Sequence, residues 1–518
     1  MKALLAVVAL LASGGAFFFY APPRSWIWLQ PIAWVPAFFV IARLSGPRAF
    51  LAGWLVGAAS ILGGYYWIAE TVERFSSIPS AGAWFVGLAF ALASGFYAAI
   101  FAWGFDPVRR ASGRWWPLGI AAWFTALEFL NPQLFPHFQG SMWYQAPWLF
   151  LVTAITGTSG VTFLVIFCNA VALQLFEAWT GRDRSARRAF VANAAVLMAM
   201  LLFAMTVSAL RLDRIDALEA SVDSLRVALV QPNHDVPRRR EMRLQEPAAF
   251  ANDLVAMSRE ALREHPGIEV FVWPEGALTR EPGAERNRAV LEFVREAGVE
   301  VWTGANVRPA DSEGEHRTRN SAYRIDRNGE IDVRYDKNIL VPFGETMPLA
   351  ERFPVLRGIR GPGDFARGDS LPIYQAESAR FAFLICYEAI QAGYVRRAVL
   401  QAPELLVNLT FDAWYGDTSE PHTHLMLAAV QAAQYGLPLL RSTTTGISAI
   451  VDTRGLITEK TGVFTREVLV ADVPKLRLPT FYARMGDWLP WSCSAVALGL
   501  LLRGLGLLLR GRHASPRN

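Results

Sequence analysis

The chain has 518 residues, of which 53% are hydrophobic and 18% are charged, and its mean hydropathy is +0.24. The apolar residues, with 18 Trp and 33 Phe in the whole chain, concentrate in residues 1–215 and in a short C-terminal segment. This division excludes a single soluble globule and predicts a multidomain membrane protein with one polar domain. The net charge of +5 does not indicate nucleic-acid binding, because most arginines lie in short loops between apolar segments.

A membrane-spanning helix needs ~20 mainly apolar residues. Seven such segments precede the polar region and one follows it, at residues 3–20, 25–42, 49–68, 82–105, 115–130, 147–176, 189–210 and 485–509. We therefore expect about eight spans: a membrane domain of seven transmembrane helices in residues 1–215 and a C-terminal one in 484–510. The sixth segment is long enough to be tilted or broken, and it contains Gly157 and Gly160. For the first segment the alternative is a cleaved signal peptide.

Basic residues concentrate in the loops on one side of these spans. With a cytoplasmic N-terminus, the loops on that side carry Lys2, Arg43, Arg48, Arg109, Arg110, Arg114, Arg182, Arg184, Arg187, Arg188, Arg510, Arg512 and Arg517. The opposite loops before the polar region contain only Arg24 and Arg74. The positive-inside rule therefore predicts that both termini are cytoplasmic and that the polar region lies outside the cytoplasm.

Between residues 220 and 475 the pattern changes to short β-rich segments that alternate with amphipathic helices. The predicted strands are residues 224–231, 268–275, 299–306, 321–326, 379–388, 404–410, 438–444 and 448–452. The predicted helices are residues 253–265, 286–298 and 423–436. This alternation favours a layered α/β domain.

The polar region contains one cysteine, Cys386, since Cys168 and Cys493 fall in apolar segments. It follows the apolar run FAFLI and precedes YEAI, which suggests a strand that turns into a helix. At a helix N-terminus the main-chain N–H groups and the helix dipole lower a thiol pKa, so we expect a reactive thiolate. Considered alone, a cysteine in this context is more often a buried core residue.

Two charged residues also follow predicted strands. Glu275 ends the run VFVWPE, at the sheet edge where α/β domains bind ligands, and burial would raise its pKa and make it a general base. Lys337 precedes ILVPFGE, and its ammonium group could stabilise an oxyanion. Considered alone, each of these two residues is more often an exposed loop residue. His422 and His424 have no metal-ligand cluster beside them in the sequence, so a polar pocket or surface role is expected for them.

Glu275, Lys337 and Cys386 in this order are more specific than any one of them. The segments VWPEGAL, YDKNILVPFGETMPL and LICYEAI resemble the three catalytic motifs of the nitrilase superfamily. LVPFGE, NLTFDAWYGDTSEPHTH and GLPLLRSTTTGISAIVD further resemble the apolipoprotein N-acyltransferases. This resemblance covers nearly the whole chain, and it implies a seven-plus-one helical bundle joined to a periplasmic nitrilase-like αββα sandwich in residues 220–475.

The resemblance also implies roles for individual residues. Glu275 would be the base, Lys337 the oxyanion partner and Cys386 the nucleophile. Glu345 would be a second acid near these three, Tyr387 and Glu388 would shape the site, and Trp414 and Tyr415 would lie on a mobile loop over the lipid entrance. The family uses no metal and no cofactor.

The chain departs from the family pattern at several positions. Gln431, Gln434 and Leu437 stand where basic and acidic residues are common, and Phe411 stands where asparagine is usual. TTTG replaces a turn that usually contains asparagine, and RRREMR stands where a tryptophan is expected. These departures leave the three motifs intact and concern acceptor recognition and the shape of the site.

The sequence therefore predicts an inner-membrane enzyme that moves an acyl chain from a phospholipid to Cys386 and then to the α-amine of a diacylglyceryl-cysteine in a lipoprotein. We expect a monomer that binds no nucleic acid. One alternative is a membrane-tethered amidase or nitrilase that uses water as the acceptor, although eight spans are an extensive anchor for an enzyme with a soluble substrate. The other is a non-catalytic membrane scaffold, which the intact set of three residues disfavours.

Overall fold

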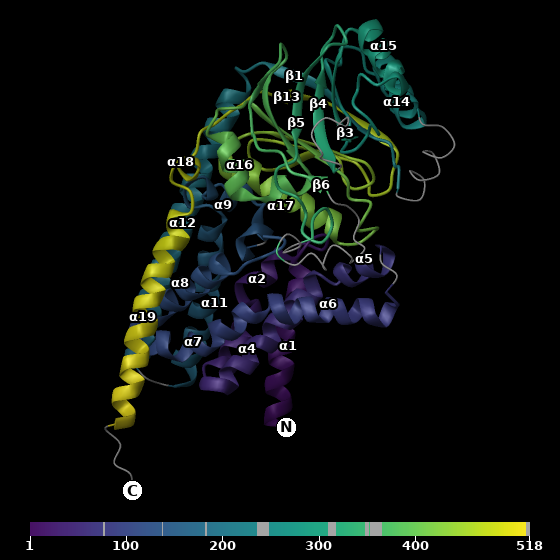
Figure 1. Cartoon of the computed structure of the whole chain (residues 1–518). Helices are drawn as coiled ribbons and strands as arrows, with labels where there is room; N and C mark the ends of the chain where they lie inside the picture. The colour runs from purple at the N-terminus through teal and green to yellow at the C-terminus, as the bar shows by residue number, and fades with distance from the viewer. Residues whose placement is uncertain are drawn as a thin grey trace. The chain divides into compact units, whose positions relative to one another are not determined.

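The computed structural model describes residues 1–75, 78–136, 138–181, 184–235, 248–308, 317–347, 352 and 365–513 (Figure 1). The chain separates into two units. A helical unit contains residues 1–73, 78–212 and 485–518, and an α/β unit contains residues 74–77 and 213–484.

The helical unit is built from apolar helices joined by short turns. They are α1 (Lys2–Tyr20), α2 (Gln30–Ala33), α3 (Val35–Ile41), α4 (Gly46–Gly64), α5 (Trp67–Phe75), α6 (Ser80–Ser94), α7 (Phe96–Ser112), α8 (Trp116–Leu130), α9 (Pro147–Phe150), α10 (Thr153–Thr156), α11 (Thr158–Thr180), α12 (Arg184–Glu219) and α19 (Trp488–His513), with 3₁₀ helices η1 (Ile27–Leu29), η2 (Gly113–Trp115) and η3 (Gln139–Trp143). Residues 213–219, at the end of α12, belong to the α/β unit.

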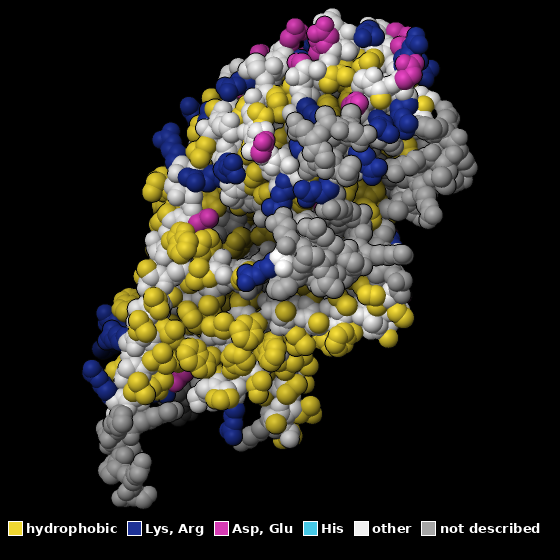
Figure 2. Space-filling model, viewed as in Figure 1, with side chains coloured by type: hydrophobic (Ala, Val, Ile, Leu, Met, Phe, Trp, Pro, Cys, Tyr) yellow, Lys and Arg dark blue, Asp and Glu magenta, His cyan; other side chains and the backbone are white. Residues whose placement is uncertain are grey.

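Large hydrophobic side chains face outward from these helices. Leu5, Phe85, Trp179 and Leu202 are 62–79% exposed, and Figure 2 shows hydrophobic side chains covering this part of the molecule. A surface of this kind is stable against lipid and not against water. Five helical segments of the described chain are long and apolar enough to cross a membrane, or six if the bent pair α4 and α5 is one span. The unit is therefore a membrane domain.

Four of the eight predicted spans are not single helices. The segments predicted at 49–68 and 82–105 each run from one helix into the next, α4 into α5 and α6 into α7. The segment predicted at 25–42 divides into η1, α2 and α3, with a proline in the first turn of both α2 and α3. Proline is favoured at the start of a helix because it lacks an N–H group, and for the same reason it interrupts a longer helix. The segment predicted at 147–176 is broken at Gly157, whose φ of 63° no ordinary helix residue adopts, so that only α11 is long enough to span.

The α/β unit contains two sheets. The first has the order β13-β1-β2-β3-β4-β5, with β6 paired to β4, and the second has the order β12-β11-β10-β9-β8-β7. The strands are β1 (Ser224–Gln231), β2 (Val270–Val272), β3 (Glu300–Val307), β4 (Thr318–Ile325), β5 (Ile331–Asp336), β6 (Phe365–Ala366), β7 (Tyr374–Gln375), β8 (Arg380–Ile385), β9 (Leu405–Thr410), β10 (Leu439–Thr443), β11 (Ala449–Val451), β12 (Ile457–Lys460) and β13 (Glu467–Pro474).

Helices cover the outer faces of these two sheets. α14 (Ala249–Glu264) packs on β1 and β13 and contacts α15 (Arg288–Ala297), while α17 (Glu420–Tyr435) packs on β10 and β11 and contacts α16 (Ala392–Val399) (Figure 1). Between the sheets, the Trp302 ring of β3 stacks on the Phe381 ring of β8 with their centroids 4.0 Å apart. The layers are helix, sheet, sheet and helix, which confirms the predicted αββα sandwich.

The parallel pairs explain where this unit places its loops. β1, β2 and β3 are parallel neighbours in the first sheet, and β8, β9 and β10 are parallel neighbours in the second. The loops that follow β2 and β8 therefore leave from carboxyl edges, where ligands bind in open α/β sheets.

Candidate active site

The three predicted catalytic residues each follow a strand. Glu275 comes three residues after the end of β2, Lys337 comes directly after β5, and Cys386 comes directly after β8. Glu275 and Lys337 therefore belong to the first sheet and Cys386 to the second. The exposed fractions of the three residues are 7%, 1% and 6%, so the site lies inside the sandwich.

The Glu275 carboxyl is held from one side. Its Oε1 accepts a hydrogen bond from Asn320 Nδ2 at 2.5 Å, while its Oε2 has no partner among the described residues. Burial raises the pKa of Glu275 against the opposing effect of Lys337, as expected for a general base. Gly304 makes this position possible, because a Cβ atom there would lie 2.7 Å from the Cα of Glu275.

Lys337 lies between two carboxylates. Its Nζ is 2.8 Å from Glu345 Oε2 and 3.6 Å from Glu275 Oε1. Burial opposes the charge of Lys337, but Glu345 and Glu275 outweigh it and raise the pKa of the lysine above its ordinary value. Asn320 Nδ2 also donates to Glu345 Oε1 at 3.1 Å, so one amide group bridges both acids. The structure thus brings Glu345 into the site, as the resemblance implied.

Cys386 lies at a strained turn. Its φ of 51° is in the left-handed region, and it begins the 3₁₀ helix η6 (Cys386–Ile390) directly after β8. The predicted strand-to-helix turn is confirmed, but the predicted lowering of the thiol pKa is wrong. Burial, followed by the charge of Glu275, raises the pKa of Cys386 well above its usual value. A five-residue 3₁₀ helix provides too small a dipole to reverse this effect, so the thiol needs a base to remove its proton.

Glu388 connects the turn at Cys386 to the loop at Lys337. Its Oε1 accepts from the main-chain N–H groups of Asn338 at 2.6 Å and Ile339 at 3.0 Å, and its Oε2 accepts from Ile385 N and Tyr335 Oη, both at 2.7 Å. Tyr387, the neighbour of Glu388, is buried, and burial raises its pKa to about 12. Glu388 therefore lies at the site, while the role of Tyr387 in shaping it stays a prediction.

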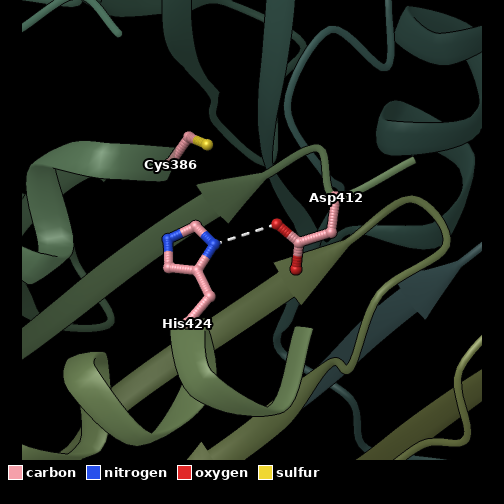
Figure 3. Close-up of side chains that lie close together, drawn as sticks. All are labelled: Cys386, Asp412 and His424. Carbon is pink, nitrogen blue, oxygen red and sulfur yellow. Dashed lines mark hydrogen bonds and ion pairs between the residues drawn. The ribbon is translucent and has the colours of Figure 1, made fainter. Parts of the chain in front are cut away.

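A second buried group of polar side chains adjoins Cys386. Cys386 Sγ, a carboxylate oxygen of Asp412 and a ring nitrogen of His424 all lie within 4.8 Å of one another (Figure 3). His424 Nδ1 is 3.0 Å from Asp412 Oδ1, and Arg441 Nη2 donates to Asp412 Oδ2 at 2.8 Å. Sequence spacing did not reveal these contacts, because Asp412 is distant from His424 along the chain and Arg441 lies on another strand. The expectation that no cysteine or carboxylate clusters beside the histidines is wrong for His424, because the fold brings Cys386 and Asp412 next to it. His422 is half-buried two positions earlier.

The loop after β9 contains the two predicted substrate-loop residues. Trp414 is half-buried and Tyr415 is buried. The Trp414 ring packs edge-on against the Phe411 ring, with the ring centroids 5.5 Å apart. Phe411, one of the departures from the family pattern, is therefore part of the packing of this loop. The role of the loop in lipid entry stays a prediction.

Two other departures lie in α17. Gln434 Nε2 donates to Gln431 Oε1 at 2.6 Å, and both side chains are buried. A neutral hydrogen-bonded pair thus occupies positions where charged residues are common.

The remaining departures lie outside α17. Leu437 is fully buried, and the hydroxyl groups of Thr444 and Thr445 in the TTTG turn are buried without a partner among the described residues. The departure at RRREMR lies outside the described residues.

The arrangement fits acyl transfer through a thioester. A buried carboxyl group, a buried ammonium group and a buried thiol act on one another electrostatically in this site, and each charge acts more strongly there than in solvent. Nucleophilic catalysis at an acyl carbon needs these three functions.

Comparison with known proteins identifies the class. Residues 226–478, which include Glu275, Lys337 and Cys386, match the carbon-nitrogen hydrolase family, and residues 13–171 match the apolipoprotein N-acyltransferase N-terminal domain. Among solved structures, the chain is similar to a carbon-nitrogen hydrolase from Helicobacter pylori, with a TM-score of 0.39 and 14% identity over 49% of this chain and 89% of that one. The α/β unit is a nitrilase-like domain.

Relatives of full length identify the family. The chain is 31% identical to an apolipoprotein N-acyltransferase from Rhodopseudomonas palustris over 98% of this chain and 95% of the relative. It is 30% identical to one from Geobacter metallireducens over 90% of both chains. The chain belongs to the apolipoprotein N-acyltransferase family.

Proposed function

We propose that this chain transfers a fatty acyl group from a membrane glycerophospholipid, through a thioester on Cys386, to the α-amine of a diacylglyceryl-cysteine at the N-terminus of a lipoprotein. One observation carries the proposal. Relatives named apolipoprotein N-acyltransferases match 90–98% of the chain, so the likeness includes the membrane domain as well as the nitrilase-like unit. A hydrolase of soluble substrates has no need of the membrane domain.

In the first half-reaction, Cys386 Sγ attacks the ester carbonyl carbon of the phospholipid. Glu275 takes the thiol proton, a C–S bond forms, and Lys337 stabilises the oxyanion of the tetrahedral intermediate. The intermediate collapses by breaking the C–O bond to glycerol. Glu275 then returns the proton to the glycerol oxygen, so that a lysophospholipid leaves and an acyl thioester remains.

In the second half-reaction, the lipoprotein amine attacks the thioester carbon. A C–N bond forms, the C–S bond breaks, and Glu275 moves a proton from the nitrogen to Sγ. The products are an amide and the free thiol. The buried position of Cys386 supports transfer in preference to hydrolysis, since water competes poorly for a thioester in a closed site.

Both substrates keep their acyl chains in the bilayer. Each methylene group withdrawn from lipid costs about 0.8 kcal/mol, so the enzyme has to operate at the membrane. We infer that the nitrilase-like unit lies in the periplasm and that both termini are cytoplasmic, because Arg109, Arg110 and Arg114 lie together at one end of α7 and η2. Trp414 and Tyr415 would lie over the lipid entrance, and the enzyme would act as a monomer.

The test is acyl transfer by the full-length protein in detergent, with a phospholipid labelled in its acyl chain. Without an acceptor, intact-protein mass spectrometry should show the mass of one acyl group on the enzyme, removable by neutral hydroxylamine. A lipopeptide with a free α-amine should discharge this adduct, and an N-blocked lipopeptide should not. Cys168→Ala and Cys493→Ala are matched controls that should behave like the parent.

Three results would contradict the proposal. Release of free fatty acid at the same rate with or without the lipopeptide would make the protein a hydrolase. An adduct that persists in Cys386→Ala would assign another nucleophile. A Cys386→Ala variant that still supports lipoprotein maturation in cells would leave only a scaffold function.

A further inference from the structure

Four buried polar residues form a continuous chain of hydrogen bonds that ends at Cys386. His424 Nδ1 contacts Asp412 Oδ1 at 3.0 Å, and Asp412 Oδ2 accepts from Arg441 Nη2 at 2.8 Å. Arg441 Nη1 donates to Asn408 Oδ1 at 2.6 Å, and Asn408 Nδ2 donates to the carbonyl oxygens of Leu384 at 3.1 Å and Cys386 at 3.3 Å. We call His424, Asp412, Arg441 and Asn408 the support chain.

The support chain ends at a strained residue. A non-glycine residue with a φ of 51° is unfavourable and persists only where its surroundings hold it. Asn408 holds the main-chain carbonyl on each side of Ile385, so it fixes the direction in which the chain leaves β8. This direction determines where Sγ points. Figure 3 shows the His424 ring next to Cys386, with one ring nitrogen bonded to Asp412.

All members of the support chain are buried, with exposed fractions of 0–4%. A buried guanidinium and a buried carboxylate are costly unless their geometry is good, and removal of a partner leaves an unpaired charge. Asp412 carries both the ion pair with Arg441 and the contact with His424. Its two oxygens are thereby fixed, and the Asp412–Arg441 pair in turn fixes the Asn408 amide.

We propose that His424 is a positioning residue for the nucleophile: by anchoring Asp412 it orders the support chain that keeps Cys386 in its strained conformation. This inference rests on the proposed role of Cys386. It gives His424 no contact with the reacting acyl group.

A proton-transfer role fits the geometry less well. Burial and Arg441 lower the pKa of His424, while Arg441 and His424 together hold the pKa of Asp412 below its usual range in spite of burial. Asp412 is therefore an anion and His424 a neutral ring that donates its Nδ1 proton to Asp412. Because the His424 Nδ1–H group always donates to the Asp412 carboxylate, its effect is to orient that carboxylate. Asparagine at position 424 can reproduce this hydrogen bond, since its amide nitrogen occupies the place of Nδ1.

A metal ion is the competing interpretation, since Cys386, Asp412 and His424 could each offer a ligand atom. Both oxygens of Asp412 are already bonded, one of them to a guanidinium. Lys337 also acts on the thiol electrostatically and favours its anionic form. Two fixed cations next to the cluster oppose the binding of a third.

The experiment uses the full-length enzyme with Cys168→Ala and Cys493→Ala, so that Cys386 is the thiol that reacts. Three variants are compared: His424→Leu, His424→Asn, and His422→Asn as the matched control. The rate of alkylation by iodoacetamide, which requires no acyl transfer, and kcat and KM for labelled phospholipid are measured together with Tm. We expect His424→Leu to slow alkylation and to lower kcat by about 10²-fold, the usual cost of a misplaced reactive atom, with KM unchanged. His424→Asn should recover most of both rates, and His422→Asn should match the parent.

Thr410→Val provides a second variant in case His424→Leu does not fold. Thr410 Oγ1 donates to Asn408 Oδ1 at 3.0 Å, so the valine loosens the same amide without burying a new charge. It should slow alkylation by a smaller factor than His424→Leu. Folded variants that alkylate at the parent rate would overturn the proposal.

Other results separate the possible causes. If His424→Asn is as slow as His424→Leu, His424 transfers a proton and the positioning role is wrong. If EDTA changes the alkylation rate of the parent, the cluster holds a metal and the proposal also fails. If Cys386→Ala retains acyl transfer, the proposed function itself fails. If Cys386 is required for transfer but His424→Leu is alkylated at the normal rate, only the role of His424 is wrong.

Discussion

Glu388 Oε1 accepts a hydrogen bond from the main-chain N–H of Asn338 at 2.6 Å, and this bond ties the turn of the nucleophile to the loop that carries Lys337. The two segments come from different sheets, β8 from the second and β5 from the first. A carboxylate that accepts from both loops fixes the distance between the thiol and the ammonium group more directly than sheet packing does. Glu388 therefore acts on the geometry of the site without needing to touch the substrate.

Glu388→Gln should test this function. Glutamine has one acceptor oxygen and a donor group that would face main-chain N–H donors, so buried N–H groups lose their partner. We expect a loss of stability of about 1–3 kcal/mol and a much larger relative loss of acyl transfer. Thermal unfolding and transfer assays on the same preparation measure both, with the exposed Glu377→Gln as the control. Unchanged Tm and turnover would show that the four bonds are dispensable.

Lys337→Ala should cost about 10²–10³ in the rate of acyl transfer, the usual effect of losing one oxyanion donor. Lys337→Arg should restore little, because the planar guanidinium does not fit the place of a compact ammonium between Glu345 and Glu275. Lys460→Ala, at an exposed position, is the control. Steady-state kinetics with labelled phospholipid measure the effect, and near-normal turnover in the alanine variant would remove Lys337 from the mechanism.

The reactivity of Cys386 should fall as the pH is lowered. The midpoint of this fall should lie at a higher pH than the pKa of an ordinary glutamate. The base has to be ionised to accept the thiol proton, and the pKa of Glu275 is raised by burial above its usual value of about 4.3. As the pH falls through this raised pKa, Glu275 takes up a proton and alkylation of Cys386 slows. The pH dependence of iodoacetamide labelling measures this, and Glu275→Gln should be slow and lack the acid limb. An identical acid limb in Glu275→Gln would assign it to another group.

Gly304→Ala should damage the site through the main chain of Glu275. The added Cβ would lie 2.7 Å from Glu275 Cα, Gly276 N and Pro274 O, and main-chain atoms cannot move aside as a flexible side chain can. Overpacking of this kind costs about 1–3 kcal/mol of stability, and the shift of Glu275 should lower kcat as well. Gly393→Ala is the matched control, because no atom lies within 4 Å of its added Cβ. Tm and transfer rates equal to those of the control would contradict the close approach.

The proposed orientation can be tested by labelling single cysteines in intact cells. Asn328 lies in the exposed turn between β4 and β5, and Arg114 is exposed in η2 after α7. A maleimide that crosses the outer membrane but not the inner one should label Asn328→Cys, and should label Arg114→Cys only after the inner membrane is permeabilised. Labelling of both cysteines before permeabilisation would contradict the orientation.

The sequence predicted most strands because their apolar runs are short and continuous. Residues 224–231 form β1 as predicted, and the predicted 299–306 differs from β3 by one residue at each end. β13 was not predicted, because its side chains are mostly half-buried and include charged residues at both ends of its apolar part. The breaks in the spans predicted at 25–42 and 147–176 arise at single proline and glycine residues within otherwise apolar segments. The average hydropathy of a segment does not detect such single residues.

The site was predicted less completely than the fold. Its three main residues follow from motifs, but Asn320 is a strand residue whose contact with two acids depends on how β4 lies beside the loops of β2 and β5. The same holds for the support chain, since Asn408, Asp412, His424 and Arg441 come from two strands, a loop and a helix. The thiol pKa was predicted in the wrong direction because burial and the neighbouring carboxylates are properties of the folded site, and adjacent sequence does not show them.

The stacking of Trp302 on Phe381 at 4.0 Å joins the sheet of Glu275 and Lys337 to the sheet of Cys386. Neither sheet alone carries both Glu275 and Cys386, so the candidate site exists only when both sheets are in place. A chain whose two sheets have not yet packed together therefore has the Cys386 thiol without the Glu275 carboxyl beside it. The packing of the two sheets thus completes the candidate site.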